Sequence, residues 1–207
     1  MLYFYNEMNI GIDKFNESVF LTVNGLHHEF LDPLMLTASN KFSFIPIFIL
    51  CTFVAIRYFK KQKEAYHPYI NYLLLVVVLS LQFILCFTIL PDVFKSLFQM
   101  DRPCSNPEIA DLVRLLGTDC ETTVHSFFSY KACLVLCFTS FVFFTIKEGF
   151  KWLKLLLITW CIIVSYSRVY VGDHYPINIF VSDIIGITIG YISYRFYLYL
   201  RYNLFVI

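Results

Sequence analysis

"INYLLLVVVLSLQFILCFTIL" (residues 70–90) decides the fold class of this chain, because none of its twenty-one residues is charged. A helix of about 20 apolar residues crosses the hydrocarbon core of a bilayer. The whole sequence agrees with a lipid environment: 58% of the 207 residues are hydrophobic and 19% are aromatic, which is more apolar surface than a soluble domain of this size can bury. The net charge of +1 gives no support for nucleic-acid binding.

Four further apolar segments predict additional membrane-spanning helices. They are residues 42–58, 126–146, 152–167 and 177–194. Basic residues are concentrated in segments 57–63 and 147–154 and in the C-terminal tail, so the positive-inside rule places these parts in the cytoplasm. The N-terminal segment and the loops 91–125 and 168–176 then face the other side. We therefore expect an all-α integral membrane protein with five spans, forming a single domain over residues 1–207.

Residues 1–41 are expected to lie outside the transmembrane core, which we assign to residues 42–207. Charged and histidine residues interrupt segment 13–35, although apolar residues recur there on one helical face. They are Phe15, Val19, Val23, Leu26 and Phe30. This pattern predicts an amphipathic helix that lies in the non-cytoplasmic interface. The alternative is a sixth, atypical span over the same residues, which would place the N-terminus in the cytoplasm.

Titratable residues gather on the non-cytoplasmic side, where three predicted spans emerge. They are Lys95, Arg102, His125, Arg168 and His174. Arginine offers a bidentate fork to phosphate oxygens and lysine a point charge, while two histidines can supply a nucleophile or base and an acid. No Asp/Glu cluster suited to Mg²⁺ accompanies them, so we predict a phosphate site without metal or cofactor. Each basic residue alone could instead be an anchor that extends to the headgroup region.

The order of these residues resembles the three-part signature of the type 2 phosphatidic acid phosphatase superfamily. The first part, K-x6-R-P, is present as Lys95 to Pro103. The second, P-S-G-H, is replaced by "TTVH" (122–125). The third, S-R-x5-H-x3-D, is present in "SRVYVGDHYPIN" (167–178), except that Asn178 stands at the aspartate position.

The resemblance implies a metal-independent lipid phosphomonoesterase in which His174 attacks phosphorus to form a phosphohistidine and His125 protonates the leaving group. It also implies a set of phosphate-binding residues, Lys95, Arg102, Arg168 and Thr123. The partner would be a phosphorylated lipid of the bacterial inner membrane, at a site facing the periplasm. Family substrates are phosphatidic acid, phosphatidylglycerol phosphate, undecaprenyl pyrophosphate and the phosphates of lipid A. The short chain and the divergent second motif favour lipid A phosphate.

Two positions depart from the family pattern. Val124 replaces a glycine, and Asn178 can accept a hydrogen bond but carries no charge. A second hypothesis is therefore a catalytically impaired member that binds or transports phosphorylated lipid. We expect Asp173 to point elsewhere than its neighbour His174, and we leave Asp183 outside the site because it lies about 140° around a helix from Asn178.

Other polar residues of these segments have simpler explanations. Lys131, inside a predicted span, is more readily explained by snorkelling than by contact with phosphate. Cys104 and Cys120 share the non-cytoplasmic loop, where thiols can be oxidised, and we predict a disulfide between them.

Overall fold

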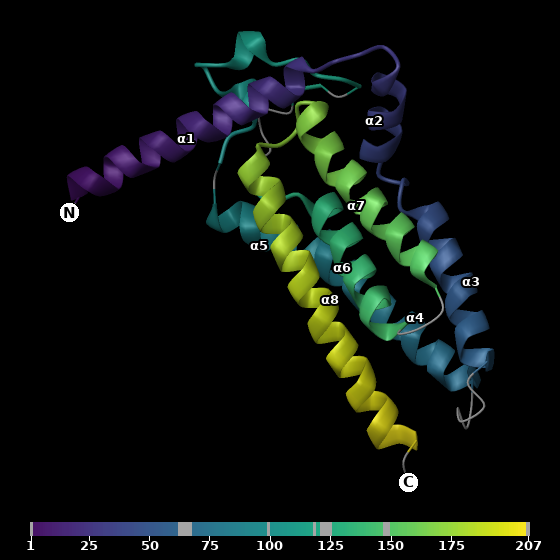
Figure 1. Ribbon diagram of the computed structural model, residues 1–207. Helices are drawn as coiled ribbons and strands as arrows, with labels where there is room; N and C mark the ends of the chain where they lie inside the picture. The colour runs from purple at the N-terminus through teal and green to yellow at the C-terminus, as the bar shows by residue number, and fades with distance from the viewer. Residues whose placement is uncertain are drawn as a thin grey trace.

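The computed structural model describes residues 2–61, 68–98, 100–117, 119–120, 126–146 and 150–205. All regular elements in this part of the chain are helical. Their bounds are α1 Leu2–Gly25, α2 Leu31–Ser39, α3 Ile45–Lys61, α4 Pro68–Ile84, η1 Leu85–Ile89, α5 Leu90–Leu97, η2 Pro103–Ser105, η3 Ala110–Leu112, α6 Tyr130–Thr145, α7 Lys151–Tyr170 and α8 Pro176–Phe205. Helices α3, α4, α6, α7 and α8 run along one another as an elongated bundle, whereas α1 crosses one end of it (Figure 1).

Within the described residues, three helices are long and apolar enough to cross a membrane: Asn71–Leu97, Lys151–Tyr170 and Pro176–Asn203. Ile45–Tyr58 and Tyr130–Thr145 are apolar but shorter. Each of these five helices overlaps with one of the five predicted segments. The prediction of an all-α membrane protein is therefore confirmed at the level of fold class.

Helix α6 forms the centre of the bundle. It packs against α4, α7 and α8, and ten of its 16 residues are buried. A helix that is apolar on all sides suits such a position, because each face meets another helix. The central place of α6 brings the chain that precedes it to the end of the bundle where the candidate site lies.

Close packing joins α6 to α8 at two glycines. A Cβ atom added to Gly186 would lie 2.4 Å from the carbonyl oxygen of Cys133, and one added to Gly190 would lie 2.3 Å from that of Cys137. The two backbones can approach this closely only because glycine has no side chain, as is common where helices meet in membranes. The contact fixes α8, which carries Asn178, against α6.

The helix that contains residues 70–90 is longer than predicted, because it continues through α5 to Leu97. The π-helical turn η1 lies just before Pro91. A proline cannot donate the usual helical hydrogen bond and its ring crowds the carbonyl four residues earlier, and a wider π turn relieves that crowding. Lys95 is therefore part of a helix, whereas we expected it in a loop that begins at residue 91.

The N-terminal segment forms two helices, so the single helix predicted over residues 13–35 is wrong. Helix α1 ends at Gly25 and α2 begins at Leu31. The face of α1 that is buried carries Asn16, Phe20 and Asn24, while Phe15 of the predicted apolar face is 70% exposed.

A polar side chain anchors the end of α1. The Nδ2 group of Asn24 donates to the carbonyl oxygens of Arg114 and Tyr170, over 2.9 Å and 2.8 Å, and its Oδ1 accepts from the backbone N–H of Arg114. Asn24 thereby ties α1 to the end of α7 and to the loop before α6. Hydrophobic periodicity alone could not reveal this, because the contact depends on backbone groups of distant segments.

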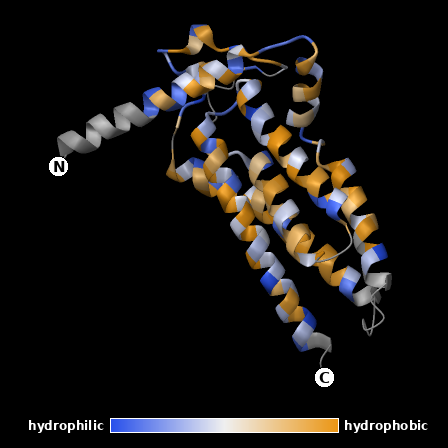
Figure 2. Cartoon of the chain, viewed as in Figure 1, coloured by the Kyte–Doolittle hydropathy of each residue, from blue (hydrophilic) through white to orange (hydrophobic). Residues whose placement is uncertain are grey.

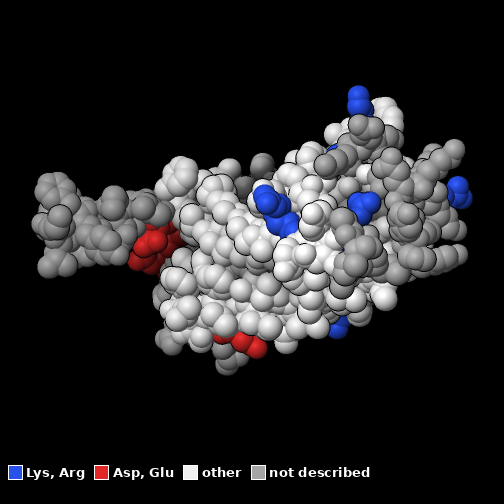
Figure 3. Space-filling model, turned by 90° about the horizontal axis from the view of Figure 1, so that it is seen from below, with Lys and Arg blue, Asp and Glu red and all other residues white. Residues whose placement is uncertain are grey.

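The two ends of the bundle differ in polarity. Apolar residues dominate the bundle helices in Figure 2, and hydrophilic residues occur along α1 and the neighbouring loops. Figure 3 views the opposite end, where Lys and Arg are spread over the surface and Asp and Glu occur at its margin. Basic residues of α3, α7 and α8 contribute to that end: Arg57, Lys151, Lys154, Arg195 and Arg201. This is the charge asymmetry on which the predicted orientation rests.

Candidate active site

The turn between α7 and α8 lies at the end of the bundle that α1 crosses (Figure 1). The backbone N–H groups of Asp173 and His174 both donate to the carbonyl oxygen of Arg168, each over 3.2 Å. Gly172 turns the chain with a φ of +90°, and a Cβ atom there would lie 2.8 Å from the Arg114 carbonyl oxygen. Glycine is thus required at this position, and the turn fixes Asp173 and His174 beside the last turn of α7.

The backbone of Ser126 orients the ring of His174, which is 6% exposed. Nδ1 lies 2.8 Å from the Ser126 carbonyl oxygen. A carbonyl oxygen can only accept, so Nδ1 carries the proton and Nε2 keeps its lone pair. Burial, reinforced by the charge of Arg168, lowers the pKa of His174 to about 3. The ring is therefore neutral at pH 7, in the form that a nitrogen nucleophile requires.

Ser126 joins three distant segments of the chain. Its N–H donates to the Met100 carbonyl oxygen over 2.7 Å, and its Oγ accepts from Nδ2 of Asn178 over 2.7 Å. Together with the bond to His174, these contacts keep residues 126–129 in an irregular conformation, so α6 begins only at Tyr130. The span predicted over residues 126–146 is wrong at its start for this reason.

Asn178 is completely buried in the first turn of α8. It contacts His174 indirectly, through Ser126, since the direct partner of Nδ1 is the serine carbonyl. Its Oδ1 has no hydrogen-bond partner among the described residues. Ser182 supports the turn by donating to the Asn178 carbonyl oxygen over 2.6 Å and accepting from the Ser129 N–H over 3.0 Å.

Asp173 links the two predicted phosphate-binding arginines. Its Oδ1 lies 3.3 Å from Nη1 of Arg102, and its Oδ2 accepts from Nη2 of Arg168. Burial raises the pKa of the Asp173 carboxyl, but the charges of Arg168 and Arg102 outweigh that effect and hold the pKa below its usual value. Asp173 is therefore ionised at neutral pH, and the structure brings Arg102 and Arg168 together around it.

A third basic residue, Lys131, lies close to this cluster. Its Nζ donates to the Ser39 carbonyl oxygen over 2.6 Å, and Nη1 of Arg168 donates to the same oxygen over 3.2 Å. The Ser39 hydroxyl also contacts Nη1 of Arg168. Lys131 is thus directed toward the arginines, and the preference for a snorkelling lysine is wrong.

The other predicted site residues are placed as follows. Lys95 lies in the last turn of α5 and is partly exposed. Thr123 and His125 lie outside the described residues, so their roles stay predictions. The disulfide between Cys104 and Cys120 is confirmed, and it restrains the loop that carries Arg102. Asp183 accepts from the Ser165 hydroxyl over 3.0 Å, so it joins α8 to α7.

Sequence reasoning missed Asp173, Ser126 and Ser39 as members of the site. One signal could have identified Asp173: it stands between two motif residues in an apolar chain, where a buried carboxylate must find cations. Nothing in the sequence distinguishes Ser126 or Ser39 from other serines, because both act partly through backbone carbonyl groups.

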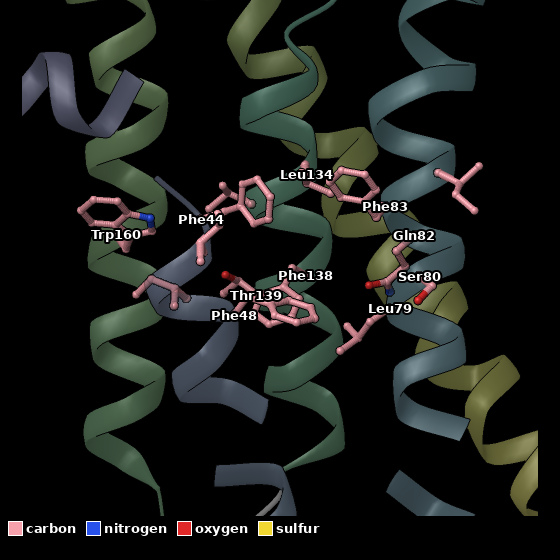
Figure 4. A pocket seen from close by; sticks show the side chains of 14 residues that line it. Phe44, Phe48, Leu79, Ser80, Gln82, Phe83, Leu134, Phe138, Thr139 and Trp160 are labelled. Carbon is pink, nitrogen blue, oxygen red and sulfur yellow. The ribbon is translucent and has the colours of Figure 1, made fainter. Parts of the chain in front are cut away.

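An apolar groove of about 430 Å³ lies between α3, α4, α6 and α7 (Figure 4). A smaller cleft lined by Lys131 shares Phe44, Leu134 and Val135 with this groove, so the two lie next to each other. Gln82, which is 3% exposed, extends from α4 toward the groove, and neither polar atom of its amide has a partner among the described residues.

Relatives of the chain include two curated bacterial proteins. The lipid A 4'-phosphatase of Porphyromonas gingivalis is 27% identical over 189 residues, which cover 89% of this chain and 73% of that protein. The lipid A 4'-phosphatase of Bacteroides thetaiotaomicron is 25% identical over 186 residues, covering 88% of this chain and 77% of that protein.

Two crystal structures share the fold. Aquifex aeolicus LpxE gives a TM-score of 0.59 at 23% identity, covering 86% of this chain and 93% of that one. The transmembrane PAP2 type phosphatidylglycerolphosphate phosphatase of Bacillus subtilis gives a TM-score of 0.62 at 14% identity, covering 90% of this chain and 86% of that one. A sequence model of the PAP2 superfamily matches residues 69–202. The chain therefore belongs to the PAP2 superfamily, the family predicted from the order of its motifs, and it is a membrane lipid phosphatase.

Proposed function

We propose that the chain hydrolyses the phosphate monoester of lipid A at the periplasmic face of a bacterial inner membrane. The observation that carries this proposal is the neutral His174 ring, whose Nδ1–H is held by the Ser126 carbonyl so that the lone pair is on Nε2. The two relatives named lipid A 4'-phosphatase support lipid A phosphate over phosphatidic acid, phosphatidylglycerol phosphate and undecaprenyl pyrophosphate.

The proposed orientation has five spans, formed by α3, the continuous helix α4–α5, α6, α7 and α8. The basic residues at the end seen in Figure 3 support a cytoplasmic position for that end. The end with His174 then faces the periplasm. Helix α1 crosses this end of the bundle, and its exposed Phe15 supports a position in the membrane interface.

The proposed mechanism uses side chains alone. Arg102 and Arg168 hold the phosphate oxygens, with Lys95 and Thr123 completing the binding site. Nε2 of His174 attacks phosphorus, a P–N bond forms and the P–O bond to the lipid breaks, while His125 gives its proton to the leaving oxygen. His125 then takes a proton from water, which attacks phosphorus, breaks the P–N bond and releases inorganic phosphate.

The lipid itself approaches from the bilayer, and we place one acyl chain in the groove of Figure 4. The groove shares Phe44, Leu134 and Val135 with the cleft at Lys131, and Lys131 shares the Ser39 carbonyl oxygen with Arg168. A phosphate held by Arg168 therefore lies close to an apolar surface that suits the attached chain.

Phosphate release from the four lipid phosphates, with the purified protein in detergent micelles, tests the proposed activity. We expect the highest kcat/KM with lipid A phosphate. The His174→Ala variant should lose activity while it still binds lipid, and acid-labile phosphate should be trapped on the wild-type protein. Lipid binding without phosphate release from any of the four substrates would favour the alternative, an impaired member that binds or transports lipid.

A Leu134→Trp variant tests the proposed acyl-chain groove separately. The larger side chain should fill the groove and raise KM several-fold for long-chain phosphatidic acid, but leave dihexanoyl phosphatidic acid unaffected. Leu155→Trp on the lipid-exposed face of α7 is the matched control. An equal effect of Leu134→Trp on both chain lengths would contradict the proposed location of the chain.

A further inference from the structure

The carboxylate of Asp173 lies where an incoming phosphate would have to bind. It presents one oxygen to each arginine: Oδ1 to Arg102 and Oδ2 to Arg168. The three side chains are 6%, 13% and 4% exposed, respectively, so water screens these contacts only weakly. A carboxylate and a phosphate use the same guanidinium N–H groups. The two anions are therefore direct competitors.

Only the Nε group of Arg168 has no hydrogen-bond partner among the described residues, and it is buried. Its Nη1 group is bonded to Ser39, and its Nη2 group is bonded to Asp173. Its backbone carbonyl is also bonded to the N–H groups of Asp173 and His174, so the carboxylate is tethered next to the guanidinium. A tethered carboxylate loses less entropy when it binds the guanidinium than a free ligand does, so it binds more favourably than a free ligand of equal charge.

We propose that Asp173 sets an affinity threshold for the site: it competes for the arginines, which keeps out weakly bound monoanionic phosphodiester headgroups and admits the more strongly bound dianionic phosphate monoesters. This inference deepens the proposed function and rests on it for the identity of the substrate. A phosphodiester carries one negative charge, as the Asp173 carboxylate does. It therefore gains no stronger electrostatic attraction to the arginines than Asp173 already has. A phosphate monoester carries a charge of about −1.5 to −2 and three free oxygens, so it can displace the carboxylate.

The membrane environment explains why such a threshold is useful. The bilayer presents anionic phosphodiester lipids at high local concentration. Two desolvated arginines without Asp173 would bind these headgroups and the site would be occupied by lipids that it cannot hydrolyse. With Asp173 in place, the two arginines and the carboxylate carry one net positive charge. Only a ligand with more negative charge than the carboxylate then binds strongly enough to displace it.

The decisive experiment compares wild-type protein with Asp173→Asn, which keeps the size of the side chain and removes its charge. Hydrolysis of phosphatidic acid is measured in dodecyl maltoside micelles with increasing phosphatidylglycerol, at constant surface dilution. We expect little inhibition of the wild type. Asp173→Asn should bind phosphatidylglycerol about tenfold or more tightly, since a repelling charge within contact distance has been removed. Asp32→Asn is the matched control, because Asp32 pairs with Arg114 outside the site.

A second readout does not depend on turnover. Inorganic phosphate should protect Asp173→Asn against thermal unfolding at about tenfold lower concentration than it protects the wild type. Tighter phosphate binding without hydrolysis of any lipid phosphate would reject the proposed function and leave the role of Asp173 standing. A folded Asp173→Asn protein that binds phosphate and phosphatidylglycerol no more tightly than the wild type would overturn the inference.

The wild-type protein alone provides a test if Asp173→Asn does not fold. Phosphatidylglycerol should inhibit it at least about a hundredfold more weakly than a non-hydrolysable phosphonate analogue of phosphatidic acid, which is dianionic like the substrate. Comparable inhibition by the two lipids would refute a charge threshold in this site.

Discussion

An Asn178→Asp substitution should raise the rate of phosphate release, but far less than the position of Asn178 in the family motif suggests. In the serine-protease triad the reverse change lowers kcat about 10⁴-fold, because the imidazole then adopts the wrong tautomer. That defect is absent here, since the Ser126 carbonyl oxygen already accepts from Nδ1 of His174. The substitution would therefore add only the negative charge of the carboxylate, which stabilises the positive charge that develops on His174 during the attack on phosphorus.

The size of that gain follows from the indirect contact between Asn178 and His174. Hydrogen bonds that involve a charged group contribute about 1.5–3 kcal/mol. Asn178 reaches His174 through Ser126, so the lower part of this range applies, which corresponds to about a tenfold rise in kcat and at most a hundredfold one. The residue is completely buried, so an ionised carboxylate there should also lower the melting temperature.

Initial rates with saturating lipid A in detergent micelles, together with thermal melts, measure both effects. Asn203→Asp on the exposed end of α8 is the matched control and should change neither quantity. A 10⁴-fold rise in kcat would refute the reasoning, because it would mean that the wild-type ring is not held in the reactive tautomer. A folded variant that binds lipid and gains no activity would favour the hypothesis of an impaired family member.

Three further predictions concern packing, the disulfide and pH. Gly190→Ala should destabilise the protein by about 1–3 kcal/mol in thermal or denaturant unfolding, because the new methyl group meets the Cys137 carbonyl, whereas Gly25→Ala, with open space around it, should be neutral. Removing the Cys104–Cys120 disulfide by substitution of both residues with serine should cost about 3 kcal/mol, and reductant should then have no further effect on the melt. Because burial lowers the pKa of His174 to about 3, its contribution to stability should be complete above the unfolded-state value near 6.5 and decline as the pH falls from there toward 3. For the same reason, protonation of His174 should not lower the activity near pH 6.5, and the NMR signals of its ring should not titrate there. An NMR titration that gives His174 a pKa near 6.5 would contradict its burial.

The motifs predicted the family without help from the structure, because they depend on residue type and spacing along the chain. Residues 70–90 predicted a membrane-spanning helix, and Lys95, Arg102, Arg168 and His174 predicted an anionic substrate. Helix ends were less predictable. The start of α6 at Tyr130 depends on backbone contacts of Ser126 with Met100 and His174, which no local pattern encodes.

The sequence by itself therefore determined the membrane environment, the helical class and the family, and it predicted the main charged residues of the site. Only the tertiary structure decided how these residues act on one another. The proton on Nδ1 of His174 is held by the carbonyl of Ser126, forty-eight positions away. Asp173, expected to point elsewhere, pairs with both Arg102 and Arg168. The physical reason is common to both findings: in a water-poor site each buried polar group must find a partner, and the available partners depend on which distant segments the fold brings together.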